Sequence, residues 1–268
     1  MKQTIFLLIY LVAGLFSTLR AQEILLYDHE AVRMNTRTVL GDLGLSFSSS
    51  TIDSFNTQLS AQPWDLVIID APGEIPVDIN SGAVPEYGST EWDDLRTYIS
   101  GGGKVIMSFW EASDSPTFGY TEMTVPEDFG LIQTGSALYN NVSDGHQAVH
   151  IWDSGHAFFD GITGPLTPAD DFNPAPVNFI LGTKLNATTG IPVAGFNPDP
   201  AQTFQSAIIV GNGGNTVYNG FLFDELVSDD GRRLIANEIQ ALLIPEPGAL
   251  GLVLFGFALI AQRLRRKR

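Results

Sequence analysis

The chain has 268 residues, of which 44% are hydrophobic and only 16% are charged, a composition that favours a folded domain over a disordered chain. It contains no cysteine, which excludes disulfide bonds, thiolate metal sites and a cysteine nucleophile. The formal net charge is −16, and this excess of negative charge opposes binding to the phosphates of nucleic acids.

Residues 1–21 have the features of a secretory signal peptide. Lys2 supplies positive charge, an apolar run extends from residue 5 to 16, and Ala21 lies at a suitable cleavage point. The alternative is a transmembrane anchor, but this run is shorter than the roughly 20 apolar residues that a spanning helix needs. We therefore expect signal peptidase to cleave after Ala21, so that the mature chain begins near Gln22.

The part between the two ends is strongly acidic. Residues 1–22 and 246–268 together hold seven basic and one acidic residue, which leaves seven basic and 29 acidic residues between them, a net charge near −22. Roughly 220 residues are enough for one sizeable core, so we expect a single domain over residues 22–244. Its charge favours cations or basic partners.

Strands and helices are expected to alternate along the first half of this domain. Short apolar runs predict strands, and apolar residues at helical spacing predict helices. The expected strands are residues 23–27, 45–50, 64–70 and 104–110, and the expected helices are residues 35–44, 52–59 and 92–100. The run WDLVIID at residues 64–70 is continuously apolar, which is typical of a central parallel strand covered on both faces.

The second half is less regular, with expected loops at residues 112–126 and around 198–200. Residues 206–210 and 217–223 are apolar runs separated by GNGGN, which predicts a hairpin. A terminal helix follows, for which Asp229 or Asp230 can serve as the cap. Its expected buried stripe is Leu234, Ile235, Ile239, Leu242 and Leu243.

The repeated strand-helix-strand pattern predicts an α/β fold of three layers, a flavodoxin-like, mostly parallel sheet with helices on both faces. Four segments also resemble the class I glutamine amidotransferase-like fold, namely WDLVIID, YISGGGKVIMS, HAFFDGI, and SAIIVGNGG with the helix after it. The resemblance spans most of residues 23–243. It implies that His156 in HAFFDGI bonds locally in a turn while Phe158 or Phe159 enters the core.

Enzymes of that fold use a cysteine after a strand, activated by a histidine with an acidic partner. This chain has no cysteine, so it departs from the catalytic pattern. Ser108 stands in the corresponding region but lacks the G-x-S-x-G context of an exposed serine nucleophile. We interpret Ser108 as a structural residue and expect no cofactor.

Carboxylates follow several of the expected strands. Because ligand crevices in open α/β sheets form at the carboxyl ends of the strands, Asp28, Glu30, Asp70 and Glu111 are candidate crevice residues. Two interpretations remain open, an acidic pocket or solvated loop carboxylates.

Three of the four histidines lie close together in the sequence, at His146, His150 and His156, and Asp153 lies among them. Imidazole and carboxylate groups can bind zinc or act as acid and base. The alternative is structural, because QAVHIW has the pattern of a strand, with His150 and Trp152 on one face. We expect no metal site here.

The C-terminal end has three features in a fixed order. Pro245-Glu246-Pro247 precedes an apolar run at residues 248–261, and a basic tail follows. The basic residues are Arg263, Arg265, Arg266, Lys267 and Arg268. The prolines end a preceding helix, the apolar run can enter a bilayer as a transmembrane sorting helix, and the basic tail favours the cytoplasmic side.

This ending resembles the PEP-CTERM sorting signal of Gram-negative bacteria, over residues 245–268. The resemblance implies transient anchoring in the inner membrane, recognition by an exosortase, removal of the tail near residues 245–247, and delivery to the outer surface or extracellular matrix. The alternative is a permanent membrane anchor, since the flanking arginines can reach the interface of a thin bilayer.

Two functions are consistent with the sequence. The first is a non-catalytic surface or matrix protein whose domain binds a glycan such as an exopolysaccharide, a cation or a protein. The second is an extracellular hydrolase with paired carboxylates at the strand ends. Two buried carboxyls in one cleft would favour the enzyme, and a crevice filled by side chains would favour the binding role.

Overall fold

The computed structural model describes residues 22–28, 33–70, 93–108, 125–139, 148–167 and 180–243. The expected signal peptide at residues 1–21 and the expected sorting signal at residues 245–268 lie outside these ranges. Among the helices within them, none is long and apolar enough to cross a membrane.

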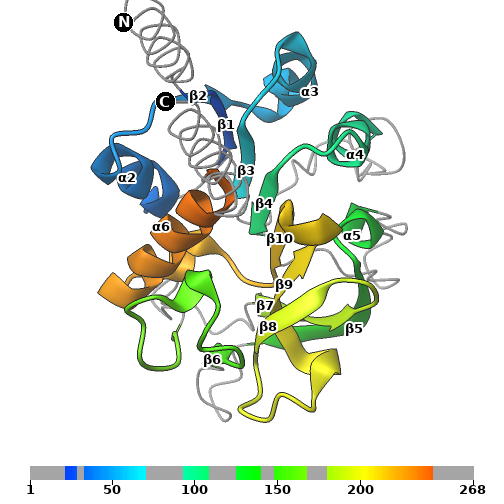
Figure 1. The fold of residues 1–268 in the computed structure, drawn as a ribbon, viewed down its shortest axis with the longest axis vertical. Coiled ribbons are helices and arrows are strands. Elements are labelled where there is room, and N and C mark those ends of the chain that lie inside the picture. Colours follow the sequence, from blue (N-terminus) through cyan, green and yellow to red (C-terminus); the bar gives the residue numbers. More distant parts are fainter. Residues whose placement is uncertain are drawn as a thin grey trace, which may run out of the picture.

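The described strands form one mixed sheet (Figure 1) with the order β2-β1-β3-β4-β10-β9-β7-β5, and β8 and β6 lie off this path. In chain order, the strands are β1 (Ile24–Tyr27), β2 (Phe47–Ser50), β3 (Leu66–Asp70), β4 (Val105–Ser108), β5 (Leu131–Tyr139), β6 (His150–Ile151), β7 (Ile180–Ala187), β8 (Ile191–Gly195), β9 (Ser206–Gly211) and β10 (Thr216–Asn219). The five strands β2, β1, β3, β4 and β10 run parallel. The remaining strands join by antiparallel pairs.

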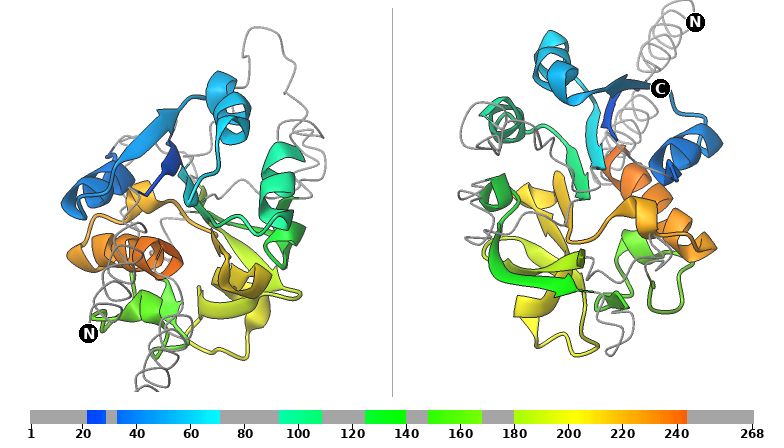
Figure 2. Two further views of the ribbon diagram at one scale, coloured as in Figure 1. Left: turned by 45° about the horizontal axis from the view of Figure 1, so that its top comes forward. Right: turned by 180° about the vertical axis from the view of Figure 1, so that it is seen from behind.

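Helices cover both faces of the parallel strands (Figures 1 and 2). The α-helices are α2 (Asn35–Asp42), α3 (Ile52–Ala61), α4 (Asp93–Ser100), α5 (Val125–Asp128) and α6 (Asp229–Leu243), and 3-10 turns include η1 (Ala157–Phe159), η2 (Thr203–Gln205) and η4 (Phe223–Glu225). One apolar core joins the sheet to α2 and α6, and a second joins its other face to α3 and α4. The mixed α/β fold with flavodoxin-like layering is therefore confirmed.

The parallel strands owe their position to continuous apolar runs. All five residues of β3 are buried, and β3 pairs with β1 on one side and β4 on the other. Leu66 and Ile68 face the α2 and α6 core, whereas Val67 and Ile69 face the α3 and α4 core. An alternating strand could not bury both faces in this way, so the prediction that this strand is central is confirmed.

The second half contains more sheet than its sequence predicted. β5, β7 and β8 extend the sheet through antiparallel pairs in a region expected to consist mainly of loops, and that expectation is corrected. The predicted hairpin of β9 and β10 is confirmed, with Gly213 and Gly214 at positive φ in its turn. β10 ends at Asn219, and the chain then turns into η4.

The terminal helix α6 is confirmed, and all five residues of its expected stripe are buried. Its cap differs from the prediction. The backbone N–H of Gly231 donates to Ser228 Oγ at 3.0 Å, while Asp229 forms an ion pair with Arg232. Ser228 therefore caps the helix in place of Asp229 or Asp230. It directly precedes the first helical residue, and its Oγ accepts from the N–H of the third one.

Candidate functional site

A row of polar side chains crosses the sheet at the carboxyl ends of four parallel strands. Asp70 is paired in register with Ser108, and Ser108 is paired with Asn219. Asp28 follows Tyr27, which is paired with Ile69, so Asp28 extends the row onto β1. Neighbouring strands lie about 4.8 Å apart, and all four residues are buried.

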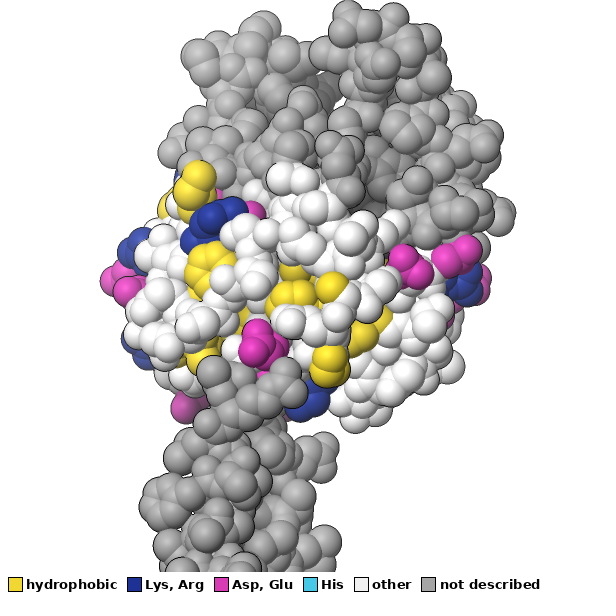
Figure 3. Space-filling model, turned by 90° about the horizontal axis from the view of Figure 1, so that it is seen from above, with side chains coloured by type: hydrophobic (Ala, Val, Ile, Leu, Met, Phe, Trp, Pro, Cys, Tyr) yellow, Lys and Arg dark blue, Asp and Glu magenta, His cyan; other side chains and the backbone are white. Residues whose placement is uncertain are grey.

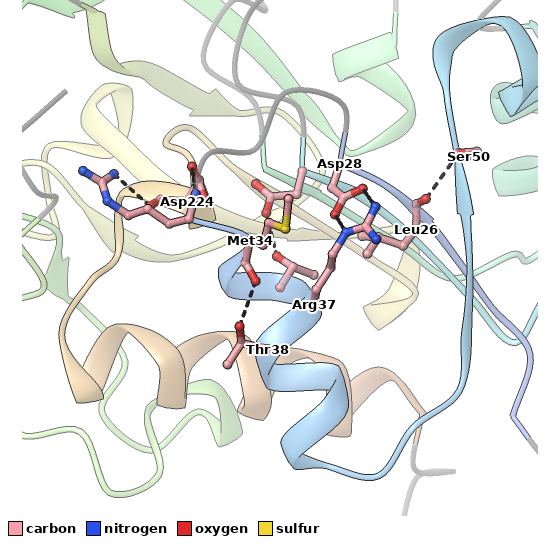
Figure 4. A network of polar contacts seen from close by, with 10 residues as sticks. Leu26, Asp28, Met34, Arg37, Thr38, Ser50 and Asp224 are labelled. Atoms are coloured by element: carbon pink, nitrogen blue, oxygen red, sulfur yellow. Dashed lines mark hydrogen bonds and ion pairs between the residues drawn. The ribbon is translucent and has the colours of Figure 1, made fainter. Parts of the chain in front are cut away.

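Asp28 is held by an ion pair with Arg37 of α2 (Figure 4). Arg37 Nε donates to Asp28 Oδ2, and Arg37 Nη2 donates to Asp28 Oδ1 at 2.7 Å. The contact is bidentate, which fixes both groups more firmly than a single hydrogen bond would. Arg37 also lies over the ring of Phe47, with its Cζ atom 5.9 Å from the ring centroid, and its hydrogen bond with Asp28 raises its pKa.

Asp70 has a different environment, because it is fully buried. Thr36 Oγ1 donates to Asp70 Oδ2 at 2.6 Å, and Asp70 Oδ1 has no hydrogen-bond partner in the described part of the chain. Burial raises the pKa of Asp70 to about 7; the hydrogen bond from Thr36 opposes this rise, and the charges of Asp224 and Asp28 add to it. Asp70 therefore gains and loses its proton close to neutral pH.

Asp224 of η4 brings a third carboxylate to this edge of the sheet. The backbone N–H of Arg33 donates to both of its carboxylate oxygens, at 2.8 and 2.9 Å, and Arg33 Nη1 donates to its carbonyl oxygen. Asn35 Nδ2 donates to the carbonyl oxygens of Phe223, Asp224 and Leu226. Figure 4 shows Asp224 and Asp28 on opposite sides of Met34. Residues 33–37 thus cover the edge between the two carboxylates.

Ser108 has a structural role. Its Oγ donates to the carbonyl oxygen of Phe221 at 2.8 Å and accepts from the backbone N–H of Phe223 at 2.7 Å. Phe221 lies between β10 and η4, and Phe223 is the first residue of η4, so the hydroxyl joins two parts of the chain that are far apart in the sequence. This arrangement fits the sequence-based interpretation of Ser108 as structural.

Glu238 of α6 lies on the same buried side as Asn219. Asn219 Nδ2 donates to Glu238 Oε2 at 3.0 Å, while Glu238 Oε1 and Asn219 Oδ1 have no partner among the described residues. Burial raises the pKa of Glu238 to about 8, and the hydrogen bond from Asn219 opposes that rise. The helix therefore places a second proton-holding carboxyl in the core.

The histidine cluster is brought together only in part. His150 lies in β6, His156 precedes η1, and His146 is outside the described residues. His156 Nδ1 accepts from the backbone N–H of Phe158, and both Phe158 and Phe159 are buried, as the resemblance implied. Burial lowers the pKa of His156, and the charge of Asp153 opposes that change. Across the described ranges, no three histidine or acidic side chains are placed to hold a metal ion.

Two of the four candidate crevice residues lie in the described part of the chain. Asp28 and Asp70 lie together at the sheet edge, whereas Glu30 and Glu111 are outside the described residues. Asp224, Asn219 and Glu238 were missed. Glu238 is spaced by four and by three residues from Leu234 and Ile235, so a helical projection would have placed it on the buried stripe.

No protein-family model matches the chain, and no curated protein sequence matches it. Solved structures with a similar arrangement include a protein assigned as a GMP synthase subunit from Thermoplasma acidophilum, at 14% identity, over 83% of this chain and 94% of that one, with a TM-score of 0.49. Another is Agd3, a carbohydrate deacetylase, at 11% identity and a TM-score of 0.48; the match covers 83% of this chain but only 32% of Agd3.

A third similar structure is PurLQS from Thermotoga maritima, at 10% identity, over 84% of this chain and 98% of that one, with a TM-score of 0.40. Both PurLQS and the GMP synthase protein are glutamine amidotransferase-like. Similarity at this level of identity concerns the fold and extends no catalytic role to this chain.

Proposed function

We propose that this protein is exported and sorted to the outer surface or extracellular matrix, where its α/β domain binds a matrix component without catalysing a reaction. The signal-peptide features of residues 1–21 support export. The ordered tail at residues 245–268, with Pro245-Glu246-Pro247 before the apolar run and the basic residues, supports processing by an exosortase.

One observation carries the non-catalytic part of the proposal, namely that residues 33–37 fill the sheet edge where a substrate would bind. Arg37 occupies both oxygens of Asp28, and Thr36 occupies one oxygen of Asp70. The Ser108 hydroxyl is used by two backbone groups. A nucleophile or base must reach its substrate, and these groups contact the protein instead.

Intact-mass analysis of the protein from its native host tests the sorting proposal. We expect a chain that begins near Gln22 and ends close to residues 245–247, recovered outside the inner membrane. A chain that retains Arg268 in the inner membrane would overturn sorting and indicate an anchored domain.

Binding is tested by retention of the purified full chain on matrix polysaccharide from the same host, immobilised on a column. A column that carries an unrelated neutral polysaccharide is the matched control. Retention on the host polysaccharide alone supports a glycan ligand. Equal behaviour on both columns contradicts it and directs the search to basic proteins or cations, which the acidic domain favours.

A second candidate is hydrolysis, and one observation favours it. Asp28 directly follows β1 and Asp70 ends the neighbouring strand β3, and the pKa of Asp70 is raised to about 7 by burial, so one carboxyl beside the Arg37-paired Asp28 can exchange a proton near neutral pH, as the general acid of glycoside hydrolysis must. Release of reducing ends from the host polysaccharide tests it. Activity that is lost in Asp70→Asn and kept in Asp65→Asn, an exposed control, would replace the binding proposal.

A further inference from the structure

Residues 33–37, here called the plug, use most of their polar groups to contact the carboxyl edge of the sheet. Arg33 contacts Asp224, Thr36 contacts Asp70, and Arg37 contacts Asp28. Three of these five consecutive residues therefore contact three buried carboxyls that come from three different parts of the chain. Because these contacts are shared by one short segment, a change at one carboxyl affects how the whole segment is held.

The backbone of the plug adds a second feature. Met34 has φ 51 and ψ 38, which is the left-handed conformation, and a residue with a Cβ atom is disfavoured there. Its side chain is 51% exposed, so packing of that side chain does little to hold it. The contacts of Arg33, Asn35, Thr36 and Arg37 must therefore hold this conformation against its intrinsic preference.

The charge balance at the edge depends on Asp70. The charges that act on Asp70 are those of Asp224 in η4 and Asp28 after β1; Arg33 of the plug contacts Asp224, Arg37 contacts Asp28, and β4 contributes the uncharged Ser108. Arg37 is already paired with Asp28, and Asp70 Oδ1 has no described partner. The hydrogen bond from Thr36 and the interaction with the backbone of Phe223 favour an ionised Asp70, but its full burial beside the carboxylates of Asp28 and Asp224 disfavours the charge and outweighs them.

We propose that the plug is pH-sensitive: it is held on the sheet edge while Asp70 carries a proton, and it loosens and uncovers the carboxyl ends of the parallel strands when Asp70 ionises. Loosening lets water reach the Asp70 carboxylate and releases the left-handed conformation at Met34. The raised pKa of Asp70, about 7 through burial, places this change in the neutral range. The proposal is independent of whether this edge of the sheet binds a ligand or hydrolyses one.

Amide hydrogen exchange of the full chain, followed by mass spectrometry and corrected for the intrinsic pH dependence of exchange, tests the proposal. Between about pH 6 and about pH 8.5, protection of amides 33–42 should fall roughly tenfold in the wild-type chain, since the ionised fraction of a carboxyl with a pKa of about 7 rises from about one tenth to nearly one. In Asp70→Asn the protection of these amides should be the same at both pH values. Asp42→Asn, at the exposed end of α2, is the control and should behave like the wild type.

Two results would overturn the proposal. The first is equal protection of the plug in the wild type and in Asp70→Asn at both pH values. The second is a joint loss of protection in the plug and in β1, which would indicate global unfolding. If Asp70→Asn does not fold, the wild-type titration decides alone: a one-proton transition in plug protection with a half-point near the pKa of about 7 supports the device, and a flat profile excludes it.

Discussion

Ser108 lies at the end of a central strand, and its hydroxyl joins two backbone groups, the carbonyl oxygen of Phe221 and the N–H of Phe223 at the start of η4. Ser108→Ala would leave a buried N–H and a buried carbonyl without partners, so we expect a loss of about 1–3 kcal/mol in the free energy of unfolding. Urea denaturation measures this loss. Ser100→Ala, an exposed serine with one local hydrogen bond, should change it by less than about 0.5 kcal/mol.

Glu238 makes a pH-dependent contribution to the free energy of unfolding, and the sign of that contribution follows from its raised pKa. The unfolded chain releases this proton near the ordinary pKa of 4.5, whereas the folded chain keeps it until about pH 8. The contribution is therefore fully present below about pH 4.5 and is lost as the pH rises through about 8. Glu238→Gln removes the titration and keeps an acceptor for Asn219.

We expect Glu238→Gln to be more stable than the wild type at about pH 8.5 by up to a few kcal/mol, since one pKa unit corresponds to about 1.4 kcal/mol, and to have a flatter profile of stability against pH. Thermal unfolding across this range is the measurement. Glu127→Gln, at an exposed position, should follow the wild type. Parallel profiles of wild type and Glu238→Gln would mean that Glu238 is not a buried acid.

At the scale of elements, the cap of α6 gives a direct comparison between two neighbours. Ser228→Ala removes the acceptor for the Gly231 N–H and should cost about 1 kcal/mol. Asp229→Ala removes only an exposed ion pair and a favourable charge at the helix start, for which we expect about 0.5 kcal/mol. Urea titration of both variants checks the order, and a larger effect at Asp229 would assign the cap to it.

The elements that the sequence predicted well are those whose burial is complete. β3 and β4 are continuous apolar runs, and α6 has a regular apolar stripe. β5 and β7 were missed because LIQTGSALY and ILGTKLNA mix glycine and polar residues with apolar ones, and β8 contains Pro192, which weakens a strand prediction. These strands form through pairing with distant segments, which no local pattern reports.

The candidate site was predictable to the extent that it follows strands. Asp28 and Asp70 come directly after or at the end of apolar runs, and the carboxyl ends of parallel strands meet at one edge. Asp224 comes from a turn more than 150 residues further along the chain. Its position depends on the pairing of β10 with β4. This pairing joins segments that are far apart in the chain, so no local sequence pattern predicts it.

At the scale of the whole molecule, the acidic balance is the dominant electrostatic feature. The domain between the two ends has a net charge near −22, and on the face in Figure 3 the basic side chains are scattered and do not form one patch. Such an excess of negative charge destabilises the folded state, because the carboxylates repel one another. Low ionic strength should therefore be the least favourable condition for this protein.

We expect the Tm to rise when NaCl increases from about 0.01 M to about 0.15 M, because the Debye length falls from about 30 Å to about 8 Å and repulsion between surface carboxylates is screened. CaCl2 at matched ionic strength should give the same rise, because screening depends on ionic strength and not on which cation supplies it; within the described ranges no three acidic or histidine side chains are placed to hold a metal ion. Scanning calorimetry of the full chain measures both. A Tm that does not change with NaCl would contradict the repulsion argument. A further rise with CaCl2 alone would indicate mass-action binding, and would make a divalent cation the first ligand to pursue for the acidic residues outside those ranges.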